Sequence, residues 1–375
     1  MYSICQHVYG NPWMGGVELG FASWREVKMK FNGLRLERVR ASPQFDGRHF
    51  CNTGVTLNLD LVAGVRLLPE LLLNGYKRRP KQSLPLVRPH EAWLRPAGTG
   101  LRTTWLGHST VLIELDGRKI LTDPVFSARA SPFSFAGPKR FHPTPATLTE
   151  LPPLDAVVLS HDHYDHLCAS TIAGIARMPG VPIITALGVG ARLERMGVPP
   201  YRIYELDWGE TCDLQGLRFI ATPSQHSSGR GVADQDATLW SSWVIQSDSH
   251  RVFFSGDTGL TEHFCDIGEM YGPFDIVIIE IGAFHPNYAA FHLGPDNALK
   301  AFNKLGGGTL LPVHWGTFDL ALHAWYEPPE TLVRLATEQG VRVITPSLGE
   351  VIEPSQVDGP TCWWRNLELG VPHMP

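Results

Sequence analysis

Hydrophobic and polar residues follow the same pattern in two segments of the chain. The run TTWLGHSTVLIEL is followed by an Asp-Gly pair and by RKILTDP, which predicts two strands joined by a tight turn. The run LWSSWVIQ, the turn SDSH and the run RVFFSGDT repeat this pattern. The second strand of each pair is followed by an aspartate, Asp123 in the first and Asp257 in the second. This repetition predicts two structurally related halves.

Four more apolar runs have the composition of strands. DAVVLSH, LRFIATPSQH, DIVIIEIGAFH and GTLLPVHWG are short and rich in β-branched and aromatic residues. Helices are expected over residues 295–305 and 329–339, and the alternation of strands with helices predicts an α/β fold in which helices cover the sheets. Histidine or aspartate follows several of these strands, where a rigid sheet can hold binding groups.

The N-terminal part of the chain has a different character. Residues 1–95 show no clear periodicity apart from a candidate helix over residues 59–73, and they end in the turn-rich segment KRRPKQSLPLVRPHEAWLRPAG. We therefore expect an N-terminal extension over residues 1–95, packed on a catalytic domain over residues 96–353. Residues 354–375 are expected to form a C-terminal tail.

Composition and charge narrow the class of partner. The net charge of -5 and the pI near 6.3 give no bulk attraction to phosphate backbones, so we expect no nucleic-acid partner. The first ten residues show no secretion signal, and the longest apolar region is interrupted by charged residues, which predicts a cytoplasmic protein. Six scattered cysteines without a CxxC pair favour reduced thiols.

The same apolar region raises the question of membrane contact. LDLVAGVRLLPELLLNGYKRRPK combines clustered leucines with four basic residues near its end, and such a segment can lie peripherally on the anionic inner face of a membrane. The alternative is a core-packed helix with a solvated basic end. Pro69 favours that alternative because it interrupts a continuous amphipathic helix.

The segment HDHYDH crowds three histidines and two aspartates into six residues. Imidazole nitrogen and carboxylate oxygen are ligands of Zn²⁺, and the same ligand types bind Mn²⁺ or Fe²⁺. The alternative is a solvated polar loop. Further candidates at predicted strand ends complete a set large enough for two metal ions that share a carboxylate. The candidate ligands are His161, His163, Asp165, His166, His226, Asp257 and His314.

HDHYDH matches the HxHxDH signature of the metallo-β-lactamase superfamily, and the chain resembles this superfamily in the order of its remaining candidate ligands. The resemblance implies an αββα sandwich over about residues 101–353, with the metal ions at one edge of the sheets. It assigns His161, His163 and His226 to one ion, Asp165, His166 and His314 to the other, and Asp257 to a bridging position.

The flanking segments resemble one branch of the superfamily more closely. WLGHSTVLIEL, TDPVFS, GPKRFHPTP, SGDTG, IGAF and PVHWGTFDLALHAWYEPP are similar to N-acyl-phosphatidylethanolamine-hydrolysing phospholipase D and its bacterial relatives. The resemblance implies a dinuclear phosphodiesterase with two Zn²⁺ ions, a phospholipid or other phosphodiester as substrate, and a homodimer. We hypothesise that a metal-bridging hydroxide, oriented through the metals by Asp165 and Asp257, attacks the phosphorus.

Two other functions remain open from the sequence. A lactonase or carboxyl-ester hydrolase, acting on a small and in some cases phosphorylated substrate, would use the same hydroxide on a carbonyl carbon. It predicts a small polar pocket, whereas a phospholipase predicts a long apolar groove. A metal-stabilised scaffold or lipid-binding protein without activity is disfavoured because no candidate ligand is missing.

Several residues outside the ligand set are assigned supporting roles. His292 resembles a family histidine near the reacting group, and we predict a general acid or oxyanion stabiliser, against a packing role at a helix start. Asp123 is expected to orient a ligand histidine, with turn capping as the alternative, and His108 either does the same or shapes the site wall. His142 either faces substrate or lies in a proline-bounded surface turn, and Cys168 is expected to be an inert buried thiol.

Overall fold

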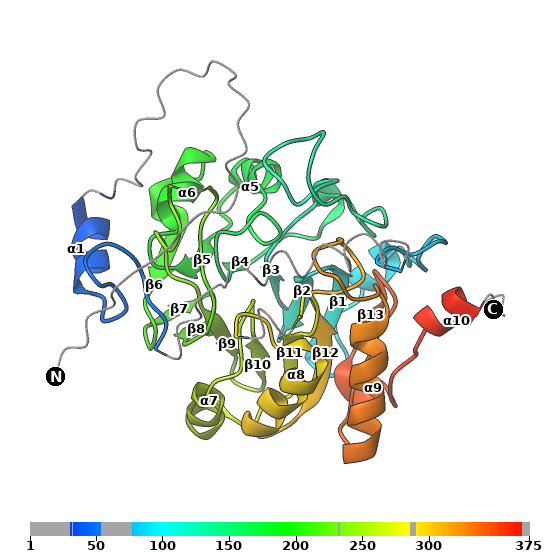
Figure 1. Ribbon diagram of the computed structural model, residues 1–375. Coiled ribbons are helices and arrows are strands. Elements are labelled where there is room, and N and C mark those ends of the chain that lie inside the picture. Colours follow the sequence, from blue (N-terminus) through cyan, green and yellow to red (C-terminus); the bar gives the residue numbers. More distant parts are fainter. Residues whose placement is uncertain (1–30, 32, 54–76, 232, 286–289, 370–375) are drawn as a thin grey trace, which may run out of the picture.

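The computed structural model consists of two β-sheets packed face to face, with helices on both outer faces (Figure 1). It describes residues 31, 33–53, 77–231, 233–285 and 290–369. The αββα sandwich expected from the sequence is therefore confirmed.

The first sheet contains seven strands in the order β13-β1-β2-β3-β4-β5-β6. β13 and β1 to β3 pair antiparallel, whereas β3 to β6 run parallel. The strands are β1 Leu101–Gly107, β2 Thr110–Leu115, β3 Arg118–Thr122, β4 Ala156–Leu159, β5 Ile183–Ala186, β6 Ile203–Leu206 and β13 Val351–Ile352.

The second sheet contains six strands in the order β12-β11-β10-β9-β8-β7. β7 to β10 pair antiparallel, and β10 to β12 run parallel. In both sheets an antiparallel pair, β2–β3 or β9–β10, is continued by parallel strands, which is the arrangement expected of two related halves. The strands are β7 Thr211–Leu214, β8 Leu217–Thr222, β9 Ser242–Gln246, β10 Arg251–Phe254, β11 Ile276–Glu280 and β12 Thr309–Val313.

Helices cover the outer face of each sheet (Figure 1). The first sheet carries α5 (Ala169–Ala176) and α6 (Gly190–Arg195), and the second carries α7 (His263–Tyr271), α8 (Gly294–Lys304) and α9 (Glu327–Gln339). The two helices predicted over residues 295–305 and 329–339 correspond to α8 and α9 and are confirmed. Short 3₁₀ turns occur at Leu148–Glu150, Pro200–Arg202 and Pro354–Gln356.

Strand β4 shows how the sequence specifies this layering. Val157 and Leu159 belong to the core between the first sheet and its helices, together with Ile172 of α5. Ala156 and Val158, which point the other way, belong to the core between the two sheets. Because both faces of β4 are covered, the sequence AVVL is continuously apolar, as is usual for a buried parallel strand.

Within the N-terminal extension, the segment over residues 33–41 packs on the first sheet. In α1 (Gly33–Ala41), Arg35 donates hydrogen bonds to Glu205 of β6 at 2.5 Å and to Glu194 of α6 at 2.7 Å, and Val39 is fully buried. The helix expected over residues 59–73 lies outside the described residues. The division of the chain at residues 95 and 353 stays a prediction.

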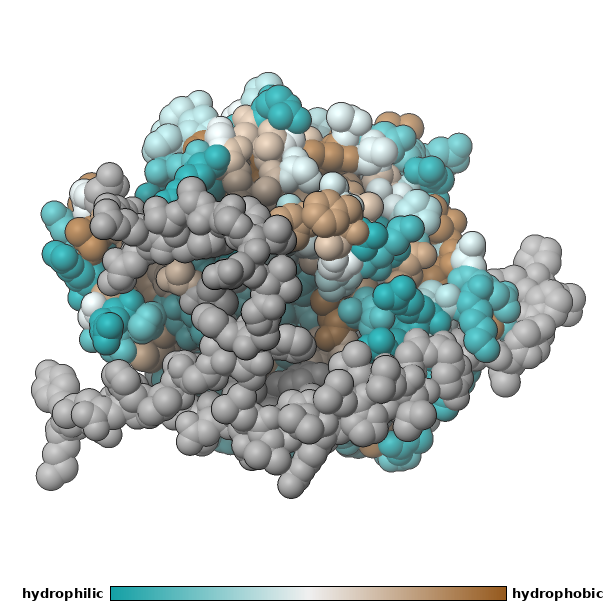
Figure 2. Space-filling model, turned by 45° about the horizontal axis from the view of Figure 1, so that its top comes forward, coloured by the Kyte–Doolittle hydropathy of each residue, from teal (hydrophilic) through white to brown (hydrophobic). Residues whose placement is uncertain are grey.

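Two further short helices are α4 (His90–Trp93), which precedes β1, and α10 (Trp364–Leu369), which follows β13. Trp363 and Trp364, in the predicted C-terminal tail, are buried and pack on Trp315 with ring centroids 5.4 Å apart in both cases. None of the helices in the described part of the chain has both the length and the apolar character to span a bilayer. On the described surface shown in Figure 2, hydrophobic residues form small groups among hydrophilic ones.

Candidate metal centre

The candidate ligands lie at one edge of the sandwich, where strands of both sheets end. His163, Asp165 and His166 lie in the loop between β4 and α5. The ends of parallel strands meet at one edge of a sheet, so residues far apart in the sequence come together there. The residues that end or follow a strand are His108 after β1, Asp123 after β3, His161 after β4, His226 after β8, Asp257 after β10, Glu280 in β11 and His314 after β12.

His161, His163 and His226 form a first group. Nδ1 of His163 lies 2.9 Å from Nε2 of His161 and 3.2 Å from Nε2 of His226. Burial lowers the pKa of all three rings, and that of His161 and His226 falls well below its usual value. Nδ1 of His226 bonds the carbonyl oxygen of Phe291 at 3.0 Å, which leaves Nε2 for the group. Three neutral rings with converging nitrogens fit a cation as a ligand set.

Asp165, His166 and His314 form a second group. Oδ2 of Asp165 lies 3.5 Å from Nε2 of His166 and 3.3 Å from Nε2 of His314. Both of these Nε2 atoms are buried and make no well-aligned hydrogen bond within the described residues, although Oδ2 of Asp257 lies 3.1 and 3.2 Å away. A buried polar atom without a partner is costly, so these orphaned nitrogens are the feature expected where a cation binds.

Asp257 lies between the two groups. Its Oδ2 is 3.1 Å from Nε2 of His166 and 3.2 Å from Nε2 of His314. The same oxygen is 3.7 Å from Nε2 of His226 and 3.9 Å from Nε2 of His161. One carboxylate oxygen thus faces histidines from both groups, which is the position that a shared ligand requires.

The electrostatics of the second group also favour a cation. Burial alone would raise the pKa of Asp165 and Asp257, but the adjacent His166 outweighs it and holds the pKa of both carboxyls well below its usual value. Burial likewise opposes a charge on the histidines, yet Asp257 raises the pKa of His166 well above its usual value and that of His314 to about 10. The carboxylates of Asp257, which is buried, and Asp165, which is partly buried, are therefore stabilised by positive charge, which a divalent cation supplies.

Asp123 orients His166 from the end of β3. Its Oδ2 lies 2.7 Å from Nδ1 of His166, and it accepts hydrogen bonds from the backbone N–H of Ser160 at 2.7 Å and the Ser160 hydroxyl at 2.6 Å. Asp123 and His166 are fully buried. A carboxylate on Nδ1–H fixes the tautomer and turns Nε2 toward the site, in agreement with the predicted orienting role.

The backbone is locally strained around these positions. His108, Asp123 and His314 have positive φ angles of 53°, 31° and 65°. Left-handed backbone at such residues costs on the order of 1 kcal/mol or more each and persists only where the surrounding fold imposes it. Gly256, with φ 54°, has the same conformation, and a Cβ there would lie only 2.4 Å from Cβ of Ser160. The fold thus gives up some backbone stability to place these side chains.

His292 lies beside Asp257 and pairs with Glu280, a residue that the sequence reasoning missed. Nδ1 of His292 is 3.3 Å from Oε2 of Glu280 and 4.0 Å from Oδ2 of Asp257. Burial opposes the charged ring, but Glu280 outweighs it and the pKa of His292 is raised. Oε1 of Glu280 accepts the N–H groups of Leu293 at 3.0 Å and Thr258 at 3.2 Å. A glutamate inside the apolar run IVIIEIGAF was the available signal, because a buried carboxylate needs partners.

The structure also shows the surroundings of His108, His142 and Cys168, for which the sequence suggested roles. His108 does more than shape a wall, because its Nε2 lies 3.0 Å from Oδ2 of Asp165. The surface-turn alternative for His142 is wrong: the ring is buried, and its nitrogens bond the carbonyl of Pro143 and the hydroxyl of Thr317. Cys168 is buried as expected.

Comparison with known families agrees with this geometry. The family model described as the beta-lactamase superfamily domain matches residues 118–315, more than half of the chain, and the chain belongs to this superfamily. It is a metal-dependent hydrolase of the metallo-β-lactamase fold.

Individual relatives indicate which branch of the superfamily the chain resembles. The chain is 42% identical over 299 residues to an uncharacterised protein of Mycobacterium tuberculosis, covering 79% of this chain and 80% of that one. It is 37% identical over 273 residues to N-acyl-phosphatidylethanolamine-hydrolyzing phospholipase D 1 of Caenorhabditis elegans, covering 68% and 77%. A solved metallo hydrolase of Ignicoccus hospitalis superposes with a TM-score of 0.52 at 25% identity, covering 67% and 97%. The predicted similarity to the phospholipase D branch is confirmed.

Proposed function

We propose that this hydrolase cleaves the phosphodiester bond of N-acyl-phosphatidylethanolamines or related phospholipids at a centre of two Zn²⁺ ions. The observation that carries the proposal is the position of Asp257, whose Oδ2 lies within 4 Å of histidines from both groups. The C. elegans relative, 37% identical, is named for this phospholipase D activity and supports the substrate class.

The two histidine groups divide the ligands between the ions. His161, His163 and His226 would hold one ion, Asp165, His166 and His314 the other, and Asp257 both. When bound, the ions supply a hydroxide nucleophile at neutral pH and neutralise charge on the phosphate oxygens. The chain itself fixes the ligand geometry, and Asp123 does so for His166 through the bond to its Nδ1.

His292 acts as the general acid in this proposal. Its Nδ1–H is directed at Glu280, so the proton available to the leaving alkoxide is the one on Nε2. The carboxylate of Glu280, which raises the pKa of His292, favours the protonated ring that a general acid requires. The geometry that supports this role is the distance of 4.0 Å between Nδ1 of His292 and Oδ2 of Asp257, one of the candidate ligands.

A phospholipid substrate also requires access from a lipid surface. Phe133 and Phe135, with ring centroids 5.6 Å apart, are 56% and 79% exposed. Their loop leads to Arg140, whose guanidinium lies 4.9 Å above the ring of Phe318, and this ring lies 5.3 Å from that of His108 in the site. Exposed aromatic side chains suit the boundary between head groups and acyl chains, so our proposal includes peripheral membrane contact through this loop. A cytoplasmic location stays a prediction.

Elemental analysis of the purified protein, combined with turnover assays, tests the proposal. The assays use bis(p-nitrophenyl) phosphate, an N-acyl-phosphatidylethanolamine and a set of lactones. We expect about two zinc ions per chain together with turnover of the lipid or the phosphodiester. Turnover of lactones alone would favour the lactonase alternative, and failure to bind metal after reconstitution would overturn both. Light scattering of the same sample tests the homodimer.

A further inference from the structure

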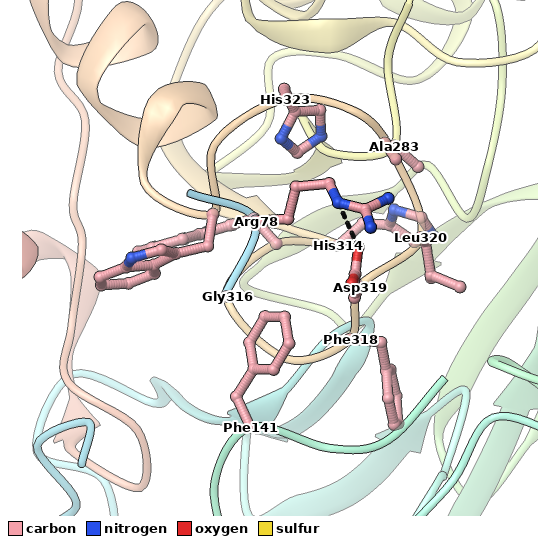
Figure 3. A pocket seen from close by; sticks show the side chains of 12 residues that line it. Arg78, Phe141, Ala283, His314, Gly316, Phe318, Asp319, Leu320 and His323 are labelled. Atoms are coloured by element: carbon pink, nitrogen blue, oxygen red, sulfur yellow. Dashed lines mark ion pairs between the residues drawn. The ribbon is translucent and has the colours of Figure 1, made fainter. Parts of the chain in front are cut away.

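A small pocket opens beside His314 of the candidate metal centre (Figure 3). Its volume of about 20 Å³ is enough for one water-sized group. Phe141, Phe318 and Trp325 line the pocket, and the side chain of Arg78 reaches into it from the N-terminal extension. A positive charge thus enters a cavity that lies next to a predicted metal ligand and is lined by aromatic side chains and by Asp319.

The charge of Arg78 is only partly balanced. Asp319 is 7% exposed and is shared by two guanidinium groups: Nε of Arg79 lies 3.0 Å from one oxygen, and Nε of Arg78 lies 3.7 Å from the other. The closer contact belongs to Arg79, which is 63% exposed, whereas Arg78 is 19% exposed. Two cations with one carboxylate leave a net positive charge.

Arg78 also has unused hydrogen-bonding capacity. Its Nε is buried without a hydrogen-bond partner, and within the described part of the chain its charged contact is the long one to Asp319. A guanidinium presents five N–H donors in a planar fork that matches the oxygens of phosphate or carboxylate. The backbone just before Arg78 is anchored, because the carbonyl of Lys77 accepts the backbone N–H of Trp325 at 3.1 Å.

We propose that Arg78 is the anion-recognition residue of this hydrolase and binds a non-bridging oxygen of the substrate phosphate. The pocket has room for one such oxygen, and the aromatic walls strengthen the charge interaction by excluding water. This inference rests on the proposed function and adds the group that selects an anionic phosphodiester over a neutral ester. It also gives the N-terminal extension a role in the site.

The test measures binding of inorganic phosphate to the metal-loaded full-length protein by isothermal titration calorimetry. Replacing Arg78 with methionine removes a charge-assisted pair, so Arg78→Met should weaken phosphate binding by about 10-fold or more. Arg78→Lys retains the charge but not the planar fork of donors, so its phosphate affinity should lie between that of wild type and that of Arg78→Met. Arg334→Met is the matched control, since it removes an exposed arginine paired with Glu338 on α9.

The outcomes separate this inference from the proposed function. The role of Arg78 would be overturned if Arg78→Met bound phosphate with unchanged affinity, or if wild type did not bind phosphate at millimolar concentrations. Neither result would bear on phosphodiester turnover, which the assays of the proposed function measure. Phosphate binding that depends on Arg78, without turnover of any phosphodiester, would support the anion site and remove the proposed function. If Arg78→Met lowers the midpoint of thermal unfolding, the Arg78→Lys variant decides. If Arg78→Met is unfolded and a folded Arg78→Lys binds phosphate with wild-type affinity, this result would count against the proposal.

Discussion

The carboxylate of Glu280 lies 3.3 Å from Nδ1 of His292 and is completely buried. Its second oxygen accepts the backbone N–H of Leu293, so one acid fixes both the charge and the position of the histidine. A carboxylate in this place stabilises a proton on the ring, which a general acid needs.

Removing only the charge of Glu280 tests this relationship. Glu280→Gln retains the shape and an oxygen for the N–H of Leu293, but it no longer stabilises the protonated ring. We expect kcat for bis(p-nitrophenyl) phosphate to fall about 10- to 100-fold, with KM within about threefold and metal content unchanged. Glu262→Gln, at an exposed position before α7, is the control. A wild-type kcat in Glu280→Gln would show that the pair is structural.

Asp257 is the residue on which the shared-ligand hypothesis depends. In Asp257→Ala neither histidine group retains the common carboxylate, so we expect metal content to fall from about two ions to about one or fewer per chain, and turnover to fall about 1000-fold or more. Elemental analysis and the phosphodiester assay measure both. Asp213→Ala, which removes an exposed carboxylate paired with Arg218 on β8, is the control. Full metal content and turnover in Asp257→Ala would end the hypothesis.

The sequence was sufficient to identify the fold class and to predict candidate ligands that the structure brings together. Strands such as AVVL are recognisable because both of their faces are buried, and a ligand that directly follows such a strand is placed by the strand itself. His161 and Asp257 were predicted as candidate ligands in this way, together with the three candidates in the short segment after His161.

Residues whose roles arise only in three dimensions were harder to predict. His108 and Asp165 are 57 positions apart and meet because β1 and β4 end at the same edge of one sheet. Arg78 comes from a segment without periodicity, and its contact with Asp319 spans most of the chain. Local sequence patterns predict neither contact, because residues so far apart in the sequence meet only through the packing of the layers.

His142 gives a pH-dependent contribution to stability. Burial, aided by the charge of Arg140, lowers the pKa of His142 from 6.5 to about 3. Between these two values the unfolded chain binds a proton that the native chain does not, so stability is lost as the pH falls below 6.5.

A substitution that cannot titrate should remove this contribution. Relative to His142→Gln, the wild type is expected to lose about 2 kcal/mol more of its unfolding free energy between pH 7 and pH 5. Urea unfolding at the two pH values measures the difference, and His90→Gln on α4 controls for the change of side chain. If the unfolding free energies of wild type and His142→Gln changed equally between the two pH values, the pKa of His142 would not be lowered in the folded state.

The paired rings of Phe133 and Phe135 should determine attachment to lipid. Moving one phenylalanine side chain from water to an apolar environment contributes about 1.5–3 kcal/mol, so replacing both with serine should reduce binding to phospholipid vesicles by about 10-fold or more. Co-sedimentation measures this binding, and Met270→Ser, at a 63% exposed hydrophobic position on α7, is the control. Because the change concerns the lipid surface, activity on vesicle substrate should fall more than activity on bis(p-nitrophenyl) phosphate. Equal vesicle binding by wild type and the double variant would exclude this loop as the membrane contact, even if phosphodiester turnover were established.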